Sequence, residues 1–228
     1  MLVPSTLAAP EAHVHLANQS DCKTFFHPGM RQVAAIKKAI PDSVDVIVPG
    51  LQELLFDETQ VPVYPYAKTF EDAAHDEVCI YHTSGSSGFP KIVVYNNKMI
   101  CTVDKMRLLA ERSQRPMFCW ATEDRSRFFS GIPLFHAAGM YLGLWTAVYD
   151  GPIPVLGPAN KTNTADIADQ IHRFGIVESG MYPPALVEDL VRNPDYLSRL
   201  TKFKFITAGG APLSKDAGDQ CCHELIEL

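Results

Sequence analysis

The chain has 228 residues, of which 46 % are hydrophobic and 20 % are charged, and its formal net charge is −6. This composition is typical of a globular protein that is large enough to bury a real core. The mildly acidic balance and the lack of a Lys/Arg cluster in the sequence argue against a nucleic-acid-binding surface. The sequence also has no apolar stretch of membrane-spanning length and no signal peptide, and its cysteine spacing fits neither a zinc site nor a disulfide framework. These features predict a cytoplasmic protein in a reducing compartment.

Short β-rich runs alternate along the chain with longer runs of helical spacing. In chain order we expect a helix at 31–40, a strand at 44–48, a short helix at 51–56, strands at 78–81 and 92–95, a helix at 97–112, a strand at 127–132, a helix at 136–149, a strand at 151–156, a helix at 164–174, a strand at 176–179, a helix at 183–192, a strand at 203–207 and a helix from 213 onward. This alternation is typical of an α/β fold with a largely parallel sheet flanked by helices. Such sheets bind ligands at the carboxyl ends of their strands.

The ten residues 82–91 read HTSGSSGFPK and join two predicted strands. Glycines let backbone N–H groups approach a ligand closely, hydroxyls donate hydrogen bonds to anionic oxygens, and the lysine adds a positive charge. The segment therefore predicts a polyphosphate-binding loop, although Gly/Ser-rich composition alone is more often that of a flexible turn. The candidate phosphate-binding residues are Thr83, Ser84, Gly85, Ser86, Ser87, Gly88 and Lys91.

The spacing within this loop is not that of a Walker P-loop. A Walker motif has four residues between its glycines, followed by Gly-Lys-Ser/Thr at the start of a helix. Here Ser86 and Ser87 alone separate Gly85 from Gly88, and β-branched residues follow Lys91. The ordered string instead resembles the phosphate-binding loop of the adenylate-forming (AMP-binding) superfamily, which includes acyl-CoA synthetases, luciferases and the adenylation domains of peptide synthetases.

Two further motifs follow in the order of that superfamily. Residues 128–140 read FFSGIPLFHAAGM, and the resemblance implies that His136 borders the carboxylate site. Residues 205–214 read FITAGGAPLS, and the resemblance assigns Gly209, Gly210 and Ala211 to the wall beside the adenine and the acyl group. Each motif alone has a simpler interpretation, since an isolated His on an apolar segment is usually a core residue and Gly-Gly is usually a turn. The finer match is to fungal enzymes related to non-ribosomal peptide synthetases (NRPS-like), including those that reduce carboxylates.

The resemblance implies a ligase that uses ATP and Mg²⁺ to convert a carboxylic acid into acyl-AMP and pyrophosphate, in secondary metabolism. It covers residues 41–218, and residues 1–40 are poorly assigned. The Mg²⁺-binding Tyr-Gly-x-Thr-Glu motif, the ribose-binding Asp and the small C-terminal domain with the catalytic Lys are not found. Carrier-protein and reductase domains are not found either. We therefore expect residues 41–228 to be a partial adenylation domain, truncated at both ends, with no catalytic residue and no metal ligand assigned.

Two hypotheses remain open from the sequence. The chain is either the central part of an enzyme whose partners are ATP and a carboxylic acid, or a non-catalytic remnant with weak nucleotide binding or an interaction role. Whether the chain is itself an enzyme therefore stays open, as do the identity of the acid and the choice between the NRPS-like and acyl-CoA synthetase subfamilies.

Overall fold

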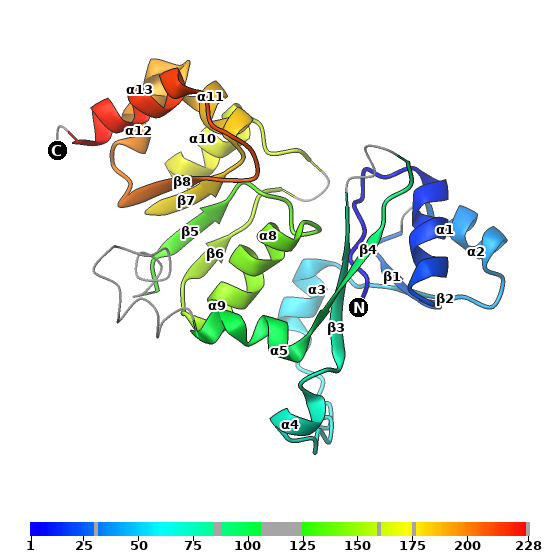
Figure 1. Ribbon diagram of the computed structural model, residues 1–228. Coiled ribbons are helices and arrows are strands. Elements are labelled where there is room, and N and C mark those ends of the chain that lie inside the picture. The colour runs from blue at the N-terminus through cyan, green and yellow to red at the C-terminus, as the bar shows by residue number, and fades with distance from the viewer. Residues whose placement is uncertain (30–31, 84–87, 106–124, 159–160, 175–176, 227–228) are drawn as a thin grey trace. The chain divides into compact units, whose positions relative to one another are not determined.

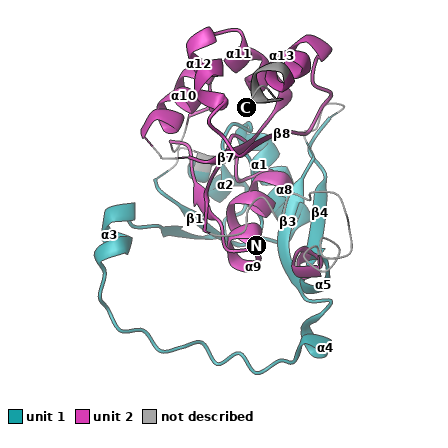
Figure 2. Cartoon of the chain, turned by 90° about the vertical axis from the view of Figure 1, so that its left-hand side faces the viewer, with its two compact units in different colours: residues 1–99 teal, residues 100–228 magenta. Residues whose placement is uncertain are grey.

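The computed structural model describes residues 1–29, 32–83, 88–105, 125–158, 161–174 and 177–226. The chain divides into two compact units, Met1–Met99 and Ile100–Leu228, which are coloured separately in Figure 2. Each unit has buried apolar residues of its own, such as Leu16 and Cys79 in the first and Phe129 and Leu190 in the second.

The first unit contains two pairs of strands and four helices among its described residues (Figure 1). In chain order these are α1 (Pro10–Gln19), β1 (Thr24–His27), α2 (Gln32–Ala39), β2 (Val44–Ile47), α3 (Leu51–Phe56), α4 (Phe70–Ala73), β3 (Glu77–His82) and β4 (Ile92–Asn96). β1 pairs with β2 in parallel, and β3 pairs with β4 antiparallel. The hairpin and the short helix at 51–56 are confirmed, whereas α1, β1 and α4 are elements that the sequence analysis does not predict.

The second unit is built on a parallel sheet in the order β6-β5-β7-β8. Its elements are β5 (Arg127–Ser130), α8 (Ala137–Met140), a π-helical segment η1 (Tyr141–Trp145), α9 (Thr146–Tyr149), β6 (Ile153–Val155), α10 (Ala165–Phe174), β7 (Ser179–Tyr182), α11 (Pro184–Val191), α12 (Pro194–Leu200), β8 (Phe205–Ala208) and α13 (Lys215–Ile226). α5 (Asn97–Ile100) joins the two units in sequence. The predicted helix at 97–112 lies outside the described residues from position 106.

The core of the second unit fills the space between its sheet and the helices α10 to α13. Phe129, Tyr182, Leu190 and Leu200 are all completely or almost completely buried there. Since side chains alternate between the faces of a strand, Phe128 lies on the opposite face of β5, where it stacks at 6.2 Å on Phe205. A parallel sheet covered by helices confirms the predicted α/β fold class.

The central strand β7 occupies Ser179–Tyr182, so the predicted strand at 176–179 is placed too early. The prediction is placed too early because Ile176 and Val177 are β-branched residues, which are enriched in strands. The position of the strand is fixed by its neighbours instead, because Gly180 pairs with both Phe129 and Ile206.

Helix α12 is absent from the prediction even though its sequence carries a recognisable start. Pro194 occupies its first turn, and the side chain of Asn193 caps it by accepting a hydrogen bond of 3.0 Å from the Asp195 amide.

None of the described helices combines the length and the apolarity that a membrane crossing requires.

Candidate functional site

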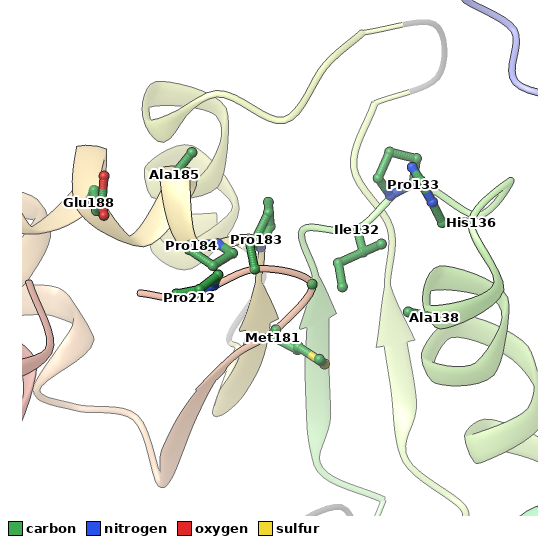
Figure 3. Close-up of a pocket in the computed structure, with 13 residues that line it drawn as sticks. Ile132, Pro133, His136, Ala138, Met181, Pro183, Pro184, Ala185, Glu188 and Pro212 are labelled. Carbon is green, nitrogen blue, oxygen red and sulfur yellow. The ribbon is translucent and has the colours of Figure 1, made fainter. Parts of the chain in front are cut away.

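A pocket of about 520 Å³ opens at the carboxyl ends of β5, β7 and β8 (Figure 3). Its lining residues are Ile132, Pro133, His136, Ala138, Met181, Pro183, Pro184, Ala185, Glu188, Gly209, Gly210, Ala211 and Pro212. The pocket therefore lies where parallel α/β sheets bind their ligands. Figure 3 shows Ile132 and Met181 between Pro183, Pro184 and Pro212 on one side and Pro133 and His136 on the other.

His136 stands at the start of the helical stretch that follows β5. It is the N-cap of α8, and its amide donates to the Pro133 carbonyl at 3.0 Å. Its side chain forms no capping hydrogen bond and is exposed. The imidazole is thus held by its backbone at the pocket and keeps its nitrogens available for a ligand.

Gly209, Gly210 and Ala211 form the wall of the pocket at the end of β8. The Gly209 amide continues the sheet by donating to the Tyr182 carbonyl at 3.1 Å. Gly210 has φ = +102°, a conformation that favours glycine, and nothing lies near the position of an added Cβ. The chain can therefore turn away from the sheet here while leaving a side-chain-free surface.

The walls of the pocket are mostly apolar. Among the described lining residues, His136 and Glu188 alone carry ionisable side chains. One carboxylate oxygen of Glu188 accepts a hydrogen bond of 3.2 Å from the Ser214 amide, which ties α11 to the segment before α13. The site can therefore enclose an apolar or aromatic group and contact it with an imidazole.

The predicted phosphate loop belongs to the first unit, where it joins β3 to β4. The Thr83 amide donates to the Lys91 carbonyl at 3.0 Å, and the Lys91 amide donates to Thr83 Oγ1 at 3.1 Å, so the two ends of the loop are paired. Gly88 has φ = +150°, and the Lys91 side chain is exposed. The candidates Ser84, Gly85, Ser86 and Ser87 lie outside the described residues.

The structure thus gathers the sequence candidates in two groups. His136 and the segment 209–211 line one pocket of the second unit, and Thr83, Gly88 and Lys91 lie together at the hairpin of the first. Met181 and the prolines of the wall are not among the sequence candidates. For Met181, Pro183 and Pro184 the signal is their place at the carboxyl end of the central strand β7, which the misplaced strand at 176–179 concealed.

The described residues contain no group of three or more His, Cys, Asp or Glu side chains that could hold a metal ion. The side chain of Glu224 and all of Glu227 lie outside the described residues.

A parallel sheet with a pocket at its carboxyl ends places the chain in the class of α/β proteins that bind a ligand at this edge of the sheet. The family model described as "AMP-binding enzyme" matches residues 3–227. The chain belongs to this family and forms part of its adenylation domain.

The curated relatives include fungal enzymes of the kinds that the motifs resemble. The chain is 33 % identical over 168 residues to a carboxylic acid reductase of Neurospora crassa, covering 72 % of this chain and 16 % of the relative. It is 31 % identical to an isocyanide synthase-NRPS hybrid of Aspergillus fumigatus over 73 % of this chain and 11 % of the relative. An adenylate-forming reductase of Stachybotrys bisbyi matches 100 % of this chain and 21 % of its own length at 26 % identity.

Solved structures show the same fold. A benzoate CoA ligase from Burkholderia xenovorans superimposes with a TM-score of 0.73 at 17 % identity, over 98 % of this chain and 43 % of that chain. The N-terminal subdomain of Klebsiella oxytoca NpsA superimposes with a TM-score of 0.72 at 15 % identity, over 97 % of this chain and 50 % of that chain. The match to the family model and the curated relatives confirm the resemblance to the adenylate-forming superfamily, and the solved structures show the same fold. The chain spans half or less of each of these relatives.

Proposed function

We propose that the chain is the nucleotide- and acid-binding part of an adenylation domain that activates a carboxylic acid with ATP. One observation carries the proposal: His136 and Gly209–Ala211, from separate motifs of the sequence, line one pocket at the carboxyl ends of the sheet. This is the placement that the activation of an acid beside a nucleotide requires.

In this reaction a carboxylate oxygen attacks the α-phosphorus of ATP, the bond to the β-phosphate bridging oxygen breaks, and acyl-AMP and pyrophosphate form. Two anions must meet, so positive charge and N–H donors are needed to offset their repulsion. We assign the pyrophosphate to Lys91 and the loop residues 83–88, the carboxylate to His136, and the adenine and acyl groups to the wall at Gly209–Ala211. Mg²⁺ enters as part of the Mg·ATP substrate, and no catalytic lysine is assigned.

The setting that we propose is NRPS-like secondary metabolism in the cytoplasm. It is supported by the curated relatives, which include a carboxylic acid reductase, an adenylate-forming reductase and an isocyanide synthase-NRPS hybrid. The second candidate function is a non-catalytic chain that binds nucleotide weakly or serves in an interaction.

The proposal predicts that Mg·ATP raises the melting temperature of the purified chain and that Lys91→Ala abolishes this shift. Removing one charge-assisted phosphate contact costs about 1.5–3 kcal/mol, which weakens binding roughly 10- to 150-fold. The matched control is Lys38→Ala, which removes an exposed lysine of the same unit from α2. Thermal unfolding followed by circular dichroism measures the shift.

An ATP–pyrophosphate exchange assay with a panel of carboxylic acids separates the two candidates. Acid-dependent exchange that Lys91→Ala reduces supports the adenylation function. A melting shift without exchange favours the non-catalytic alternative. The absence of any ATP-dependent shift in the wild-type chain would contradict both forms of nucleotide binding.

A further inference from the structure

The first residues of the chain lie alongside β3 and are joined to it by an isolated parallel β-bridge. The Val3 amide donates to the Ile80 carbonyl at 3.1 Å, and the Ile80 amide donates to the Met1 carbonyl at 2.7 Å. Leu2 pairs with Ile80 in a parallel bridge. Because the pairing is parallel, this segment runs in the same direction as β3, toward the phosphate loop.

At the end of β3 this segment meets His82, the residue directly before the loop. The Ser5 amide donates to His82 Nε2 at 3.0 Å, and His82 Nδ1 lies 2.8 Å from the Thr83 carbonyl oxygen. A carbonyl only accepts and an amide N–H only donates, so Nδ1 carries the proton and Nε2 offers its lone pair. The neutral imidazole therefore links the backbone of Ser5 to the backbone of Thr83.

A second contact reaches the other end of the loop. His15, on α1, stacks on Phe89 with ring centroids 4.8 Å apart and an interplanar angle of 22°. Leu16 and Ala17 on the same helix are buried, which anchors the helix that carries His15. Phe89 itself is 58 % exposed and follows Gly88, so its ring has a specific partner at the protein surface.

We propose that residues 1–15 act as a brace that positions the two ends of the phosphate loop, with His82 as its positioning residue. The brace contacts the loop before Thr83, through His82, and after Gly88, through Phe89. The hydrogen-bonded pair of Thr83 and Lys91 adjoins these contacts, because Thr83 directly follows His82 and Lys91 comes two residues after Phe89. Ordering a segment before it binds removes that entropy cost from the binding step, so a braced loop binds phosphate more tightly than a free one.

The brace deepens the proposed function and rests on it in one respect, namely that the phosphates of ATP are the ligand of Thr83 and Lys91. Its structural part, the ordering of the loop ends, stands on the contacts alone. The two parts can therefore be tested separately.

The binding test measures the affinity of the full chain for Mg·ATP by isothermal titration calorimetry. His82→Phe removes both hydrogen bonds of the ring, and we expect affinity to fall about 2- to 10-fold. His82→Gln, which retains an acceptor for Ser5 and a donor for Thr83, should recover most of the loss. His15→Ala should also weaken binding, and the matched control His75→Phe, at an exposed histidine of the same unit, should not.

The structural test needs no ligand. Amide hydrogen exchange followed by NMR should speed up at Thr83 and Lys91 in His82→Phe but stay constant at Val94, which pairs with Ile80 in the middle of the hairpin. Long-range ¹⁵N correlation spectra of the wild type should show the Nδ1-protonated tautomer of His82.

The outcomes separate the brace from the proposed function. If the wild type binds ATP and His82→Phe binds equally well, the positioning role is refuted. If the wild type does not bind ATP, the proposed function fails, and exchange then decides the brace: unchanged rates at Thr83 and Lys91 refute it, and faster rates support it as an ordering device of the hairpin.

Discussion

His172 is buried in the core of the second unit, where its Nε2 shares a hydrogen bond of 2.8 Å with the Tyr182 hydroxyl. The rings of Phe129 and Phe203 face it edge-on, at 6.0 Å and 4.9 Å. Burial lowers the pKa of His172 to about 4, while nearby Asp169 acts in the opposite direction. The same burial raises the pKa of Tyr182, so this pair is neutral in the folded protein at physiological pH.

The lowered pKa of His172 predicts that the folded protein loses stability in mild acid. Because the folded pKa of about 4 lies below the ordinary value of 6.5, the unfolded chain binds the proton first as the pH falls. The neutral His172 therefore contributes roughly 3 kcal/mol to the free energy of unfolding above about pH 6.5, and this contribution is lost as the pH approaches 4. Melting temperatures between about pH 7.5 and about pH 4.5 measure the effect.

The control for this experiment is His172→Gln, which retains a polar group for Tyr182 but does not titrate. Burial also lowers the pKa of His13 in the first unit, so the wild type and the variant share that contribution and their difference isolates His172. If the melting temperatures of the wild type and of His172→Gln changed equally with pH, the acid sensitivity could not be assigned to His172.

At the scale of elements, the helical stretch after β5 contains a π-helical segment, Tyr141–Trp145, that the helical pattern of 136–149 does not predict. The hydroxyl of Thr146, which directly follows this segment, donates to the Tyr141 carbonyl at 2.6 Å. Gly139 packs so closely that an added Cβ would lie 2.0 Å from the Pro133 carbonyl oxygen. The lack of a side chain at Gly139 is therefore required by the close packing of this stretch.

Gly139→Ala should destabilise the protein by about 1–3 kcal/mol, because the clash is with backbone rather than with a flexible side chain. The same Pro133 carbonyl accepts a hydrogen bond from the His136 amide, so the variant should also lower the affinity of the pocket for any ligand. The matched control is Gly218→Ala on α13, where the nearest atom to an added Cβ is 3.8 Å away. Urea denaturation measures both variants, and equal free energies of unfolding would contradict the packing argument.

Local sequence signals were sufficient for some elements and for part of the site. The short helix at Leu51–Phe56 and the hairpin strands follow from composition and from the turn residues between them. Helix α1 does not follow, because its buried positions include His13 and so break the apolar pattern. His136 and Gly210 were recognisable from ordered motifs, whereas Met181 enters the pocket through the strand neighbours of β7, which local sequence does not specify.

At the scale of the whole molecule, the described residues include an exposed apolar patch on α3. Leu51, Leu54, Leu55 and Phe56 are between 52 % and 80 % exposed. An exposed patch of this kind favours self-association of a soluble protein. We expect the purified chain to associate as its concentration rises.

Phe56→Glu should reduce this association, since a charge on the patch opposes its burial against another surface. The matched control is Gln52→Glu, which adds the same charge at an exposed polar position of α3. Light scattering coupled to size-exclusion chromatography measures the mass at several concentrations. An equal decrease in both variants would show that net charge, rather than the apolar patch, governs the association.

The strand order β6-β5-β7-β8 also has a consequence for how the protein folds. Phe128 pairs with Ser179, so the two central strands close a long stretch of intervening chain before they meet. Pairings between distant segments form slowly, because the chain loses the entropy of loop closure before it gains the contacts. His136 and Gly210 face a common space only after β5, β7 and β8 have paired, so the pocket is completed late in folding, and the ability to bind a ligand should appear later than the first helical signal.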